Sequence, residues 1–282
     1  MGLEINLSHP FTRGDSRRLK KAVPELPAYG AFTIDKWECD NFFRERGVQT
    51  PKTELFTTAT VARMLTEYGE VVLKPRRGSK GEQVYSVKSV DDINPSIDHA
   101  DFIVQQMVDL ARYHGRSLTV RAFIQKIPRH GSVPIVGSYA KITEPGKFVG
   151  NLNAGAKAEP TSAAFQMFFG DSSIPQIELD QLVKQVITAL EERGMFFEAG
   201  LDIAFDRQMH PWLIEINSVP DIDPFYDLAN RPPSYISHYE DYTMTYDEEM
   251  KKQYKELLRK ILLNKLAAKF YGKSAEAGLP GE

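Results

Sequence analysis

Apolar and polar residues alternate in two short segments near residue 210, and this pattern predicts a β-hairpin. Both segments, 201–205 and 212–220, combine aliphatic residues with single polar residues between them. Such alternation is typical of half-buried strands. The stretch between them, 206–211, is polar and turn-like. We therefore expect two antiparallel strands joined by a short turn.

The hairpin would gather three oxygen-bearing side chains on one face. Side chains two apart in a strand share a face, so Glu215 and Asn217 are predicted on one side, with Ile214 and Ile216 on the other. Asp202 lies on the opposing strand between apolar neighbours. Mg²⁺ prefers such ligands, usually one or two carboxylates together with substrate phosphates. The alternative is a half-exposed hairpin with ordinary polar residues on its solvent face.

Apolar periodicity predicts further helices and strands along the rest of the chain. A helix capped by Asp35 runs to about Gly47, and residues 239–270 form a long amphipathic C-terminal helix. We expect this last helix to pack on the body, and a dimer contact is the alternative. This order indicates an α+β protein of two small lobes. The other predicted helices are 57–68 and 177–193, and the predicted strands are 70–75, 83–87, 102–106, 118–126 and 135–142.

Composition narrows the class of protein. The 282 residues are 42% hydrophobic and 26% charged, as in a soluble globular protein. The formal net charge of −3 gives no reason to expect a nucleic acid or an anionic membrane as partner. The single cysteine, Cys39, excludes an internal disulfide and fits a reducing compartment. Without an apolar run of about 18 residues or the apolar core of a signal peptide, we expect a cytoplasmic protein.

Three further features could bind phosphate. Lys74 ends a strand and is followed by the flexible loop 78–81 with two glycines, which allow the backbone to approach a phosphate closely. The Walker motif is absent, and a surface hairpin is the alternative. Arg121 and Lys141 are lone cations on apolar strands, so each either forms a salt bridge or clamps a phosphate. The segment 151–155 is either a simple turn or a loop that faces substrate.

Together these features form an ordered series that resembles a known superfamily. The series comprises Lys36, Val72–Pro75 with Gly78–Gly81, Val104–Gln106, Val120–Arg121, Lys141, Asn151–Gly155, Asp202 and Glu215–Pro220. It resembles the ATP-grasp superfamily and is most similar to the YheC/YheD group, described as endospore coat-associated. The resemblance covers about residues 33–225. It implies the ATP-grasp fold, in which two α+β lobes grip ATP, here with an abbreviated N-terminal region and a long C-terminal helix.

The resemblance implies which residues bind ATP. Lys36 and Lys74 would contact its phosphates, and the glycine loop would fold over them as a lid. The hinge from Gln106 to Val108 would hold adenine, largely through backbone groups. The full set that the resemblance implies is Lys36, Lys74, Gly78, Ser79, Lys80, Gly81, Gln105, Gln106, Met107, Val108, Asn151 and Asn153.

The resemblance also implies the catalytic and metal-binding residues. Arg121 and Lys141 would face the γ-phosphate of ATP and the acyl phosphate formed from it. Asp202, Glu215 and Asn217 would hold two Mg²⁺ ions, with Glu215 bridging them. The implied function is an ATP- and Mg-dependent carboxylate–amine ligase that forms ADP and acts through an acyl phosphate on small-molecule or peptide substrates.

Several positions depart from the family pattern. Lys141 stands where relatives usually have Arg, which offers a bidentate fork that Lys lacks. Thr119 stands where an acidic residue often binds ribose, and Asp109 is an alternative ribose ligand. Only about 33 residues precede the first helix, too few for an independent domain. Either part of the usual substrate site is missing, or a homodimer partner or another subunit supplies it.

The predicted organisation and the alternative functions follow from these features. We expect an N-terminal arm (1–33), a small lobe (34–110), a large lobe with the metal site (111–225), and a C-terminal loop and helix (226–282). One alternative is a nucleotide-binding, coat-associated structural protein with little catalysis. Another is phosphotransfer to a protein histidine, which the six isolated histidines do not favour.

Overall fold

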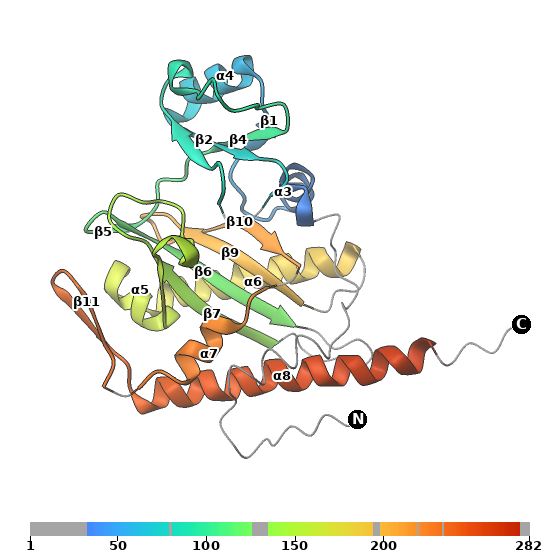
Figure 1. Ribbon diagram of the computed structural model, residues 1–282, viewed down its shortest axis with the longest axis vertical. Helices are drawn as coiled ribbons and strands as arrows, with labels where there is room; N and C mark the ends of the chain where they lie inside the picture. Colours follow the sequence, from blue (N-terminus) through green and yellow to red (C-terminus); the bar gives the residue numbers. More distant parts are fainter. Residues whose placement is uncertain are drawn as a thin grey trace, which may run out of the picture.

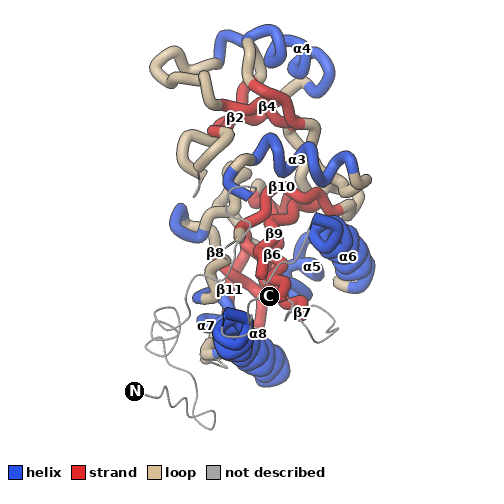
Figure 2. The backbone as a smooth tube through the Cα atoms, turned by 90° about the vertical axis from the view of Figure 1, so that its right-hand side faces the viewer, coloured by secondary structure: helices blue, strands red, loops and turns tan. Residues whose placement is uncertain are grey.

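Two main antiparallel sheets of different size, among the residues that the structure describes, lie one above the other (Figure 1). The computed structural model describes residues 33–78, 81–125, 135–193, 198–218, 220–232 and 234–276. The smaller sheet has four strands and the larger one six. The helix α3 (Lys36–Glu45) lies between them and contacts one strand of each sheet. Seen from the side in Figure 2, the two sheets form separate layers joined at this helix.

The small sheet is built around a compact apolar cluster. Its strand order is β1-β4-β2-β3, with β1 (Thr53–Leu55), β2 (Val71–Pro75), β3 (Tyr85–Val87) and β4 (Phe102–Gln106). The helix α4 (Thr58–Tyr68) packs on it through Val61 and Met64. This helix begins where the Thr57 side chain accepts a hydrogen bond from Thr60 N, and Gly69 ends it at a positive φ. A short 3-10 turn, η1 (Val90–Asp92), precedes β4.

The large sheet separates two layers of helices. Its order is β10-β9-β6-β7-β8, with the short β5 paired to β6. Helices α5 and α6 cover one face, and α7 and α8 pack against part of the other (Figures 1 and 2). The strands are β5 (Arg112–Tyr113), β6 (Arg116–Gln125), β7 (Ile135–Ile142), β8 (Lys157–Glu159), β9 (Glu198–Phe205) and β10 (Pro211–Asn217). The helices are α5 (Thr161–Phe169), α6 (Ser173–Arg193), α7 (Asp223–Ala229) and α8 (Glu248–Glu276), and η2 (Leu152–Ala154) precedes β8.

Alternation along β6 explains how the large sheet serves both core and site. The even-numbered residues Leu118, Val120, Ala122 and Ile124 are buried against the α5 and α6 layer. The odd-numbered positions point to the opposite face, where Phe123 packs with α7 and α8. Nearer the small sheet, that same face carries polar side chains toward the space between the two sheets. The period-two pattern therefore places polar side chains without disturbing the core.

Most predicted elements are confirmed, and the predicted C-terminal helix is partly wrong. Residues 236–245 form a β-hairpin, β11 (Ile236–Tyr239) and β12 (Tyr242–Thr245), so the helix begins at Glu248 rather than at Tyr239. Alternating burial of Ser237 and Tyr239, with Glu240 at a positive φ in the turn, favours the hairpin there. The helix predicted at 177–193 begins four residues earlier, at Ser173.

Some predictions fall on residues that the structure does not describe. The N-terminal arm lies outside the described residues up to position 32, as do position 126 of the predicted strand 118–126 and Gly194 after α6. Cys39 is buried in the core, as a small apolar residue would be. No helix within the described ranges is both long and apolar enough to cross a membrane.

Candidate functional site

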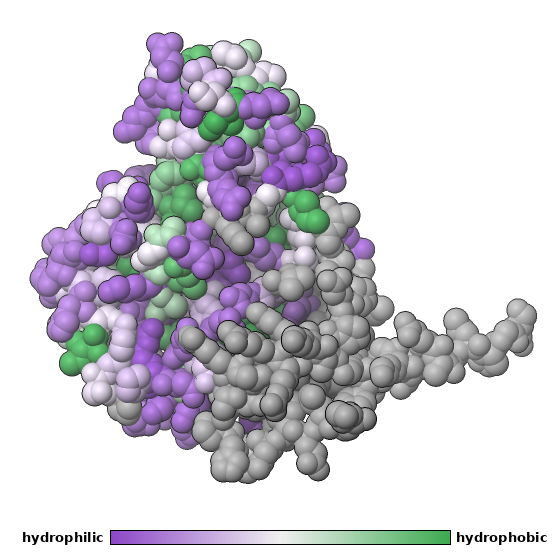
Figure 3. All heavy atoms as spheres, in the orientation of Figure 1, coloured by the Kyte–Doolittle hydropathy of each residue, from purple (hydrophilic) through white to green (hydrophobic). Residues whose placement is uncertain are grey.

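A cavity of about 510 Å³ lies between the two sheets and is lined by residues from both. In the view of Figure 3, hydrophobic side chains are visible at the narrow region between the small sheet and the large sheet. The coloured surface around them is largely hydrophilic. All the predicted site residues within the described ranges line this cavity. They are Lys36, Lys74, Gly78, Gly81, Gln105, Gln106, Met107, Val108, Arg121, Lys141, Asn151, Asn153, Asp202, Glu215 and Asn217. Ser79 and Lys80 lie outside the described residues.

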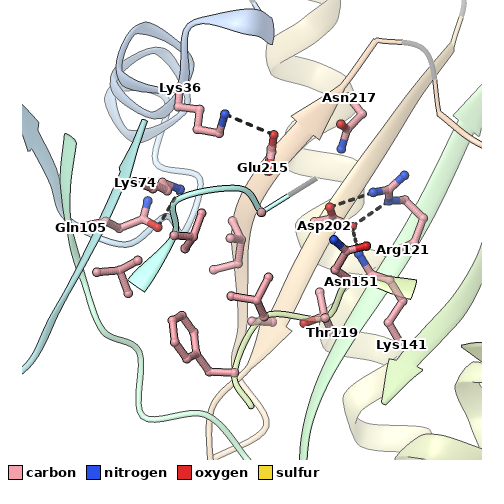
Figure 4. A pocket seen from close by; sticks show the side chains of 18 of the residues that line it. Lys36, Lys74, Gln105, Thr119, Arg121, Lys141, Asn151, Asp202, Glu215 and Asn217 are labelled. Carbon is pink, nitrogen blue, oxygen red and sulfur yellow. Dashed lines mark hydrogen bonds and ion pairs between the residues drawn. The ribbon is translucent and has the colours of Figure 1, made fainter. Parts of the chain in front are cut away.

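Asp202 is the centre of a compact charged cluster on the large sheet (Figure 4). It is the register partner of Arg121 across β6 and β9. Arg121 donates to both carboxylate oxygens, at 2.7 Å from Nε and 2.8 Å from Nη2, and Lys141 Nζ donates to Oδ1 at 2.7 Å. The two lone cations of the sequence are therefore held by one carboxylate, as the salt-bridge alternative predicts, while they also line the cavity.

Burial and charge pairing shift the pKa values of these three side chains in opposite directions. Burial alone would raise the pKa of Asp202, but the charges and hydrogen bonds of Arg121 and Lys141 outweigh it and hold that pKa well below its usual range. Burial lowers the pKa of Lys141, although the Asp202 charge opposes it. Arg121 is also buried, and its pKa is raised by Asp202. Two cations share one carboxylate, so the cluster carries a net positive charge next to the cavity.

The strand β10 contains a bulge that corrects one sequence prediction. Leu213 pairs with Ile203 and Glu215 with Asp202, so Ile214 is an extra residue in the register. Ile214 was predicted to point away from Glu215, and that prediction is wrong: both side chains line the cavity. Leu213 and Ile216 point to the core instead. The bulge therefore places an aliphatic and a carboxylate side chain next to each other on the same face.

Glu215 also links the large sheet to the helix α3. Lys36 Nζ lies 3.7 Å from Glu215 Oε1 and donates to the carbonyl of Gly78 at 2.6 Å. Near Glu215, the amide nitrogen of Asn217 is buried and has no hydrogen-bond partner among the described residues. A side-chain amide can be rotated to exchange its nitrogen and oxygen. Asn217 can therefore present its carbonyl oxygen at this position.

A chain of buried polar side chains supports Lys74 on the small sheet. Lys74 Nζ donates to Gln105 Oε1 at 2.9 Å (Figure 4). The amide nitrogen of Gln105 donates in turn to Asp40 Oδ2 at 3.0 Å and to Thr53 Oγ1 at 2.8 Å. Burial lowers the pKa of Lys74, with the charge of Asp40 opposing it. The side chain of Gln105 is thus engaged within the protein, although it forms part of the cavity wall.

The other end of the cavity is apolar. Val108, Leu110 and Ala204 are buried there, and Phe148 and Ile214 pack against them. These residues come from the segment after β4, from β9 and β10, and from the loop after β7. The cavity is therefore apolar at one end and strongly charged at the other.

Two glycines allow the strands and loops around the cavity to approach closely. A Cβ on Gly200 would lie 2.6 Å from Pro220 Cβ and 3.2 Å from Arg121 Cδ. A Cβ on Gly150 would lie 3.1 Å from Thr119 Oγ1. Gly200 thus leaves room for the side chain of Arg121 beside β9, where it reaches Asp202.

The sequence that forms the two sheets and the cavity matches the model of a known protein family. The family model described as "YheC/D like ATP-grasp" matches residues 25–94 and 90–239. The chain belongs to that family. The match includes both sheets and every predicted site residue that lines the cavity, and it confirms the resemblance seen in the sequence. A search of curated proteins finds no match.

Solved structures show the same ATP-grasp fold. The D-alanyl-alanine synthetase A of Vibrio cholerae matches with a TM-score of 0.53 and 13% identity, over 86% of this chain and 67% of that one. A carboxyaminoimidazole ribonucleotide synthase of Aspergillus clavatus, complexed with ATP, has a TM-score of 0.52 and 12% identity, over 88% and 78%. The N5-carboxyaminoimidazole ribonucleotide synthetase of Thermotoga maritima has a TM-score of 0.46 and 15% identity; the match covers 70% of this chain but only 45% of that one. The first two likenesses identify the fold alone.

Several cavity residues of this ATP-grasp chain were not predicted from the sequence. Phe148, Tyr139 and Asp221 line the cavity in addition to Ile214. Tyr139 shares the odd-numbered face of β7 with Lys141, so strand alternation was a signal that could have found it. Asp109, the alternative ribose ligand, does not line the cavity; it is exposed and pairs with Arg207 at 3.1 Å. Thr119 does line the cavity.

Proposed function

We propose that this chain binds ATP in the cavity and uses it to join a carboxylate to an amine. The observation that carries the proposal is the polarity of the cavity, which is apolar at one end and lined by Lys36, Lys74, Arg121 and Lys141 at the other. A nucleoside triphosphate has the same polarity, with a flat base at one end and a polyanion at the other. Membership of the ATP-grasp family supports the same ligand.

The apolar end is suited to the base. Phe148 and Ile214 would lie against the faces of adenine, while the segment from Gln106 to Val108 would contact its edge. Apolar walls with a few placed polar groups are usual for such sites. The four cations then fall on the phosphate side, where they would bind and orient the triphosphate. Asn151 and Asn153 would add donors from the loop after β7.

The donor set at the charged end fits Mg²⁺. Within the described ranges, no group of three or more His, Cys, Asp or Glu side chains is placed to hold a metal. The site instead offers two carboxylates, Asp202 and Glu215, which face each other across β9 and β10, and the buried amide of Asn217. One or two carboxylates completed by substrate phosphates is the usual Mg²⁺ environment. Bound Mg²⁺ would neutralise charge on the phosphates.

The reaction that this arrangement supports has two steps. A carboxylate oxygen of the first substrate attacks the γ-phosphorus, the bond to the β-phosphate oxygen breaks, and an acyl phosphate and ADP form. An amine then attacks the acyl carbon, loses a proton, and releases inorganic phosphate with formation of an amide. Arg121 and Lys141 would stabilise the negative charge on the transferred group, since fixed cations at such positions lower the barrier. Lys36 and Lys74 would hold the phosphates in line.

Calorimetric titration of ATP tests the site. We expect binding that requires Mg²⁺ in the wild-type protein and is lost in Glu215→Ala. Asp109→Ala is the matched control, because Asp109 is a carboxylate that directly follows the segment from Gln106 to Val108 but is exposed and outside the cavity. Near-normal Mg-dependent binding in Glu215→Ala would contradict the proposed metal site.

ADP release tests the activity separately from binding. We expect sustained release of ADP, over many turnovers, only when both a carboxylate and an amine from an amino-acid or peptide mixture are present. Loss of one fixed cation, as in Arg121→Ala, should cost on the order of 10²–10³ in rate. Tight ATP binding without ADP release under any mixture would instead support the alternative of a nucleotide-binding structural protein. Light scattering tests the alternative in which a homodimer partner completes the substrate site.

A further inference from the structure

Asp40 lies outside the cavity and contacts a residue that holds one of its cations. It is on α3 and its side chain is buried, with 5% of the residue exposed. Its Oδ2 atom accepts from Thr53 Oγ1 at 2.8 Å and from Gln105 Nε2 at 3.0 Å. Gln105 in turn accepts from Lys74 Nζ. These residues come from α3, β1, β4 and β2, so the polar chain crosses the small sheet.

The orientation of the Gln105 amide is the decisive part of this chain. Its nitrogen uses both hydrogens, one toward Asp40 and one toward Thr53, and its oxygen faces Lys74. The reversed amide would place its nitrogen against the ammonium of Lys74 and its oxygen against the carboxylate of Asp40. Both contacts would then be repulsive. Asp40 therefore allows only the orientation in which Gln105 accepts a hydrogen bond from Lys74.

We propose that Asp40 is a positioning residue for ATP binding, which acts through Gln105 to hold the Lys74 ammonium at the cavity wall. This inference rests on the proposed function, because it assigns Lys74 to the phosphates. Lys74 is itself buried, with 5% of the residue exposed, and its ammonium group donates to Gln105. Burial limits where this group can move, and the hydrogen bond fixes its position. A free lysine side chain loses rotamer entropy when it binds, and a held one does not.

Replacement of Asp40 by leucine removes the support and keeps the branched shape of the side chain, with two larger methyl groups in place of the carboxylate oxygens. Gln105 loses the partner that fixes its orientation, and Lys74 loses a nearby negative charge. A hydrogen bond to a charged group contributes enough that its loss should raise the Kd for ATP by roughly tenfold to a hundredfold. Asp40→Asn should remain close to wild type, since the asparagine oxygen can accept the same two hydrogen bonds.

The test combines titration of ATP·Mg²⁺ at about pH 8 with chemical acetylation of lysines read by mass spectrometry. The matched control is Cys39→Ala, which shortens the neighbouring buried side chain on α3, a member of the apolar cluster of the large sheet. In Asp40→Leu we expect weaker ATP binding and faster acetylation of Lys74 relative to Lys141, another buried lysine of the cavity. In Asp40→Asn and Cys39→Ala neither should change by more than about twofold. If Asp40→Leu does not fold, Thr53→Val keeps the shape and should give a smaller effect in the same direction.

Two results would overturn the inference. One is an equal loss of ATP affinity in Asp40→Leu and Cys39→Ala, which would indicate a general effect on α3. The other is a parallel rise in acetylation of Lys74 and Lys141, which would indicate loosening of the whole cavity. If the wild-type protein does not bind ATP, the proposed function fails, whereas the selective change at Lys74 still decides whether Asp40 positions it.

Discussion

The burial of Asp40 predicts how the stability of this protein depends on pH. Burial raises the pKa of the Asp40 carboxyl from 3.8 to about 6, and the charge of Lys74 only partly opposes it. Gln105 lies between these two charges, so Asp40 has no direct ion pair with Lys74 to offset its burial. Glu215 raises this pKa further, whereas Arg44 lowers it. The carboxyl therefore binds a proton more tightly in the folded protein than in the unfolded chain.

The sign and the size of the effect follow from this difference. Between about pH 4 and pH 6 the folded protein holds a proton that the unfolded chain has lost, so the free energy of unfolding falls as the pH rises. A pKa rise of about two units corresponds to roughly 3 kcal/mol, at about 1.4 kcal/mol for each unit. This stability is fully present below about pH 4 and is lost as the pH rises past about 6.

Urea denaturation of the wild type and of Asp40→Asn, at pH values from about 4 to 7, measures the effect. Asparagine does not titrate. The difference in the free energy of unfolding between the two proteins therefore isolates the contribution of Asp40, because the contributions of the other titrating groups are common to both. We expect this difference to shift by about 3 kcal/mol in favour of the variant as the pH rises. The control Asp109→Asn, at an exposed position, should run parallel to wild type. Parallel curves for Asp40→Asn would refute the reasoning.

Three further substitutions test other parts of the structure. Gly200→Ala should press against both Pro220 and the side chain of Arg121, cost about 1–3 kcal/mol of stability and lower the rate of ADP release. An unchanged rate would show that the close approach at Gly200 does not affect the reaction. Glu159→Ala should cost about 3–5 kcal/mol, measured by denaturation, because it leaves the largely buried side chain of Arg231 without its carboxylate. The ATP affinity of this folded variant should remain normal, since neither residue lines the cavity. Phe148→Ala should raise the Kd for ATP at least tenfold by removing an apolar wall, and an equal loss for inorganic triphosphate would show that Phe148 does not contact the base.

The residues that line the cavity could be predicted from the sequence where each lies at a fixed place on a simple element. Lys74 is the penultimate residue of a buried strand, and Arg121 and Lys141 alternate with core residues in theirs. Once the strand order is known, period-two alternation directs these side chains to the same side. The ordered series across the whole chain, rather than any single motif, made the fold and the family predictable.

What could not be predicted depended on contacts between distant segments. The bulge at Ile214 leaves no mark in a pattern that is read with a strict period of two. Asp40 is a polar residue on a predicted helix, and its burial results from partners 13 and 65 residues away. The hairpin at 236–245 was interpreted as helix because the apolar spacing of the following segment was extended too far back.

The bulge in β10 has a consequence for how a nucleotide would arrive and leave. Ile214 and Glu215 are consecutive residues, so the wall for the base and the carboxylate for the cation are joined by a single peptide bond. Their spacing would therefore stay the same if the two sheets moved relative to each other. Lys74, by contrast, belongs to the small sheet. Under the proposed function, a nucleotide that had lost contact with Lys74 would still contact two adjacent residues of one strand in the large sheet.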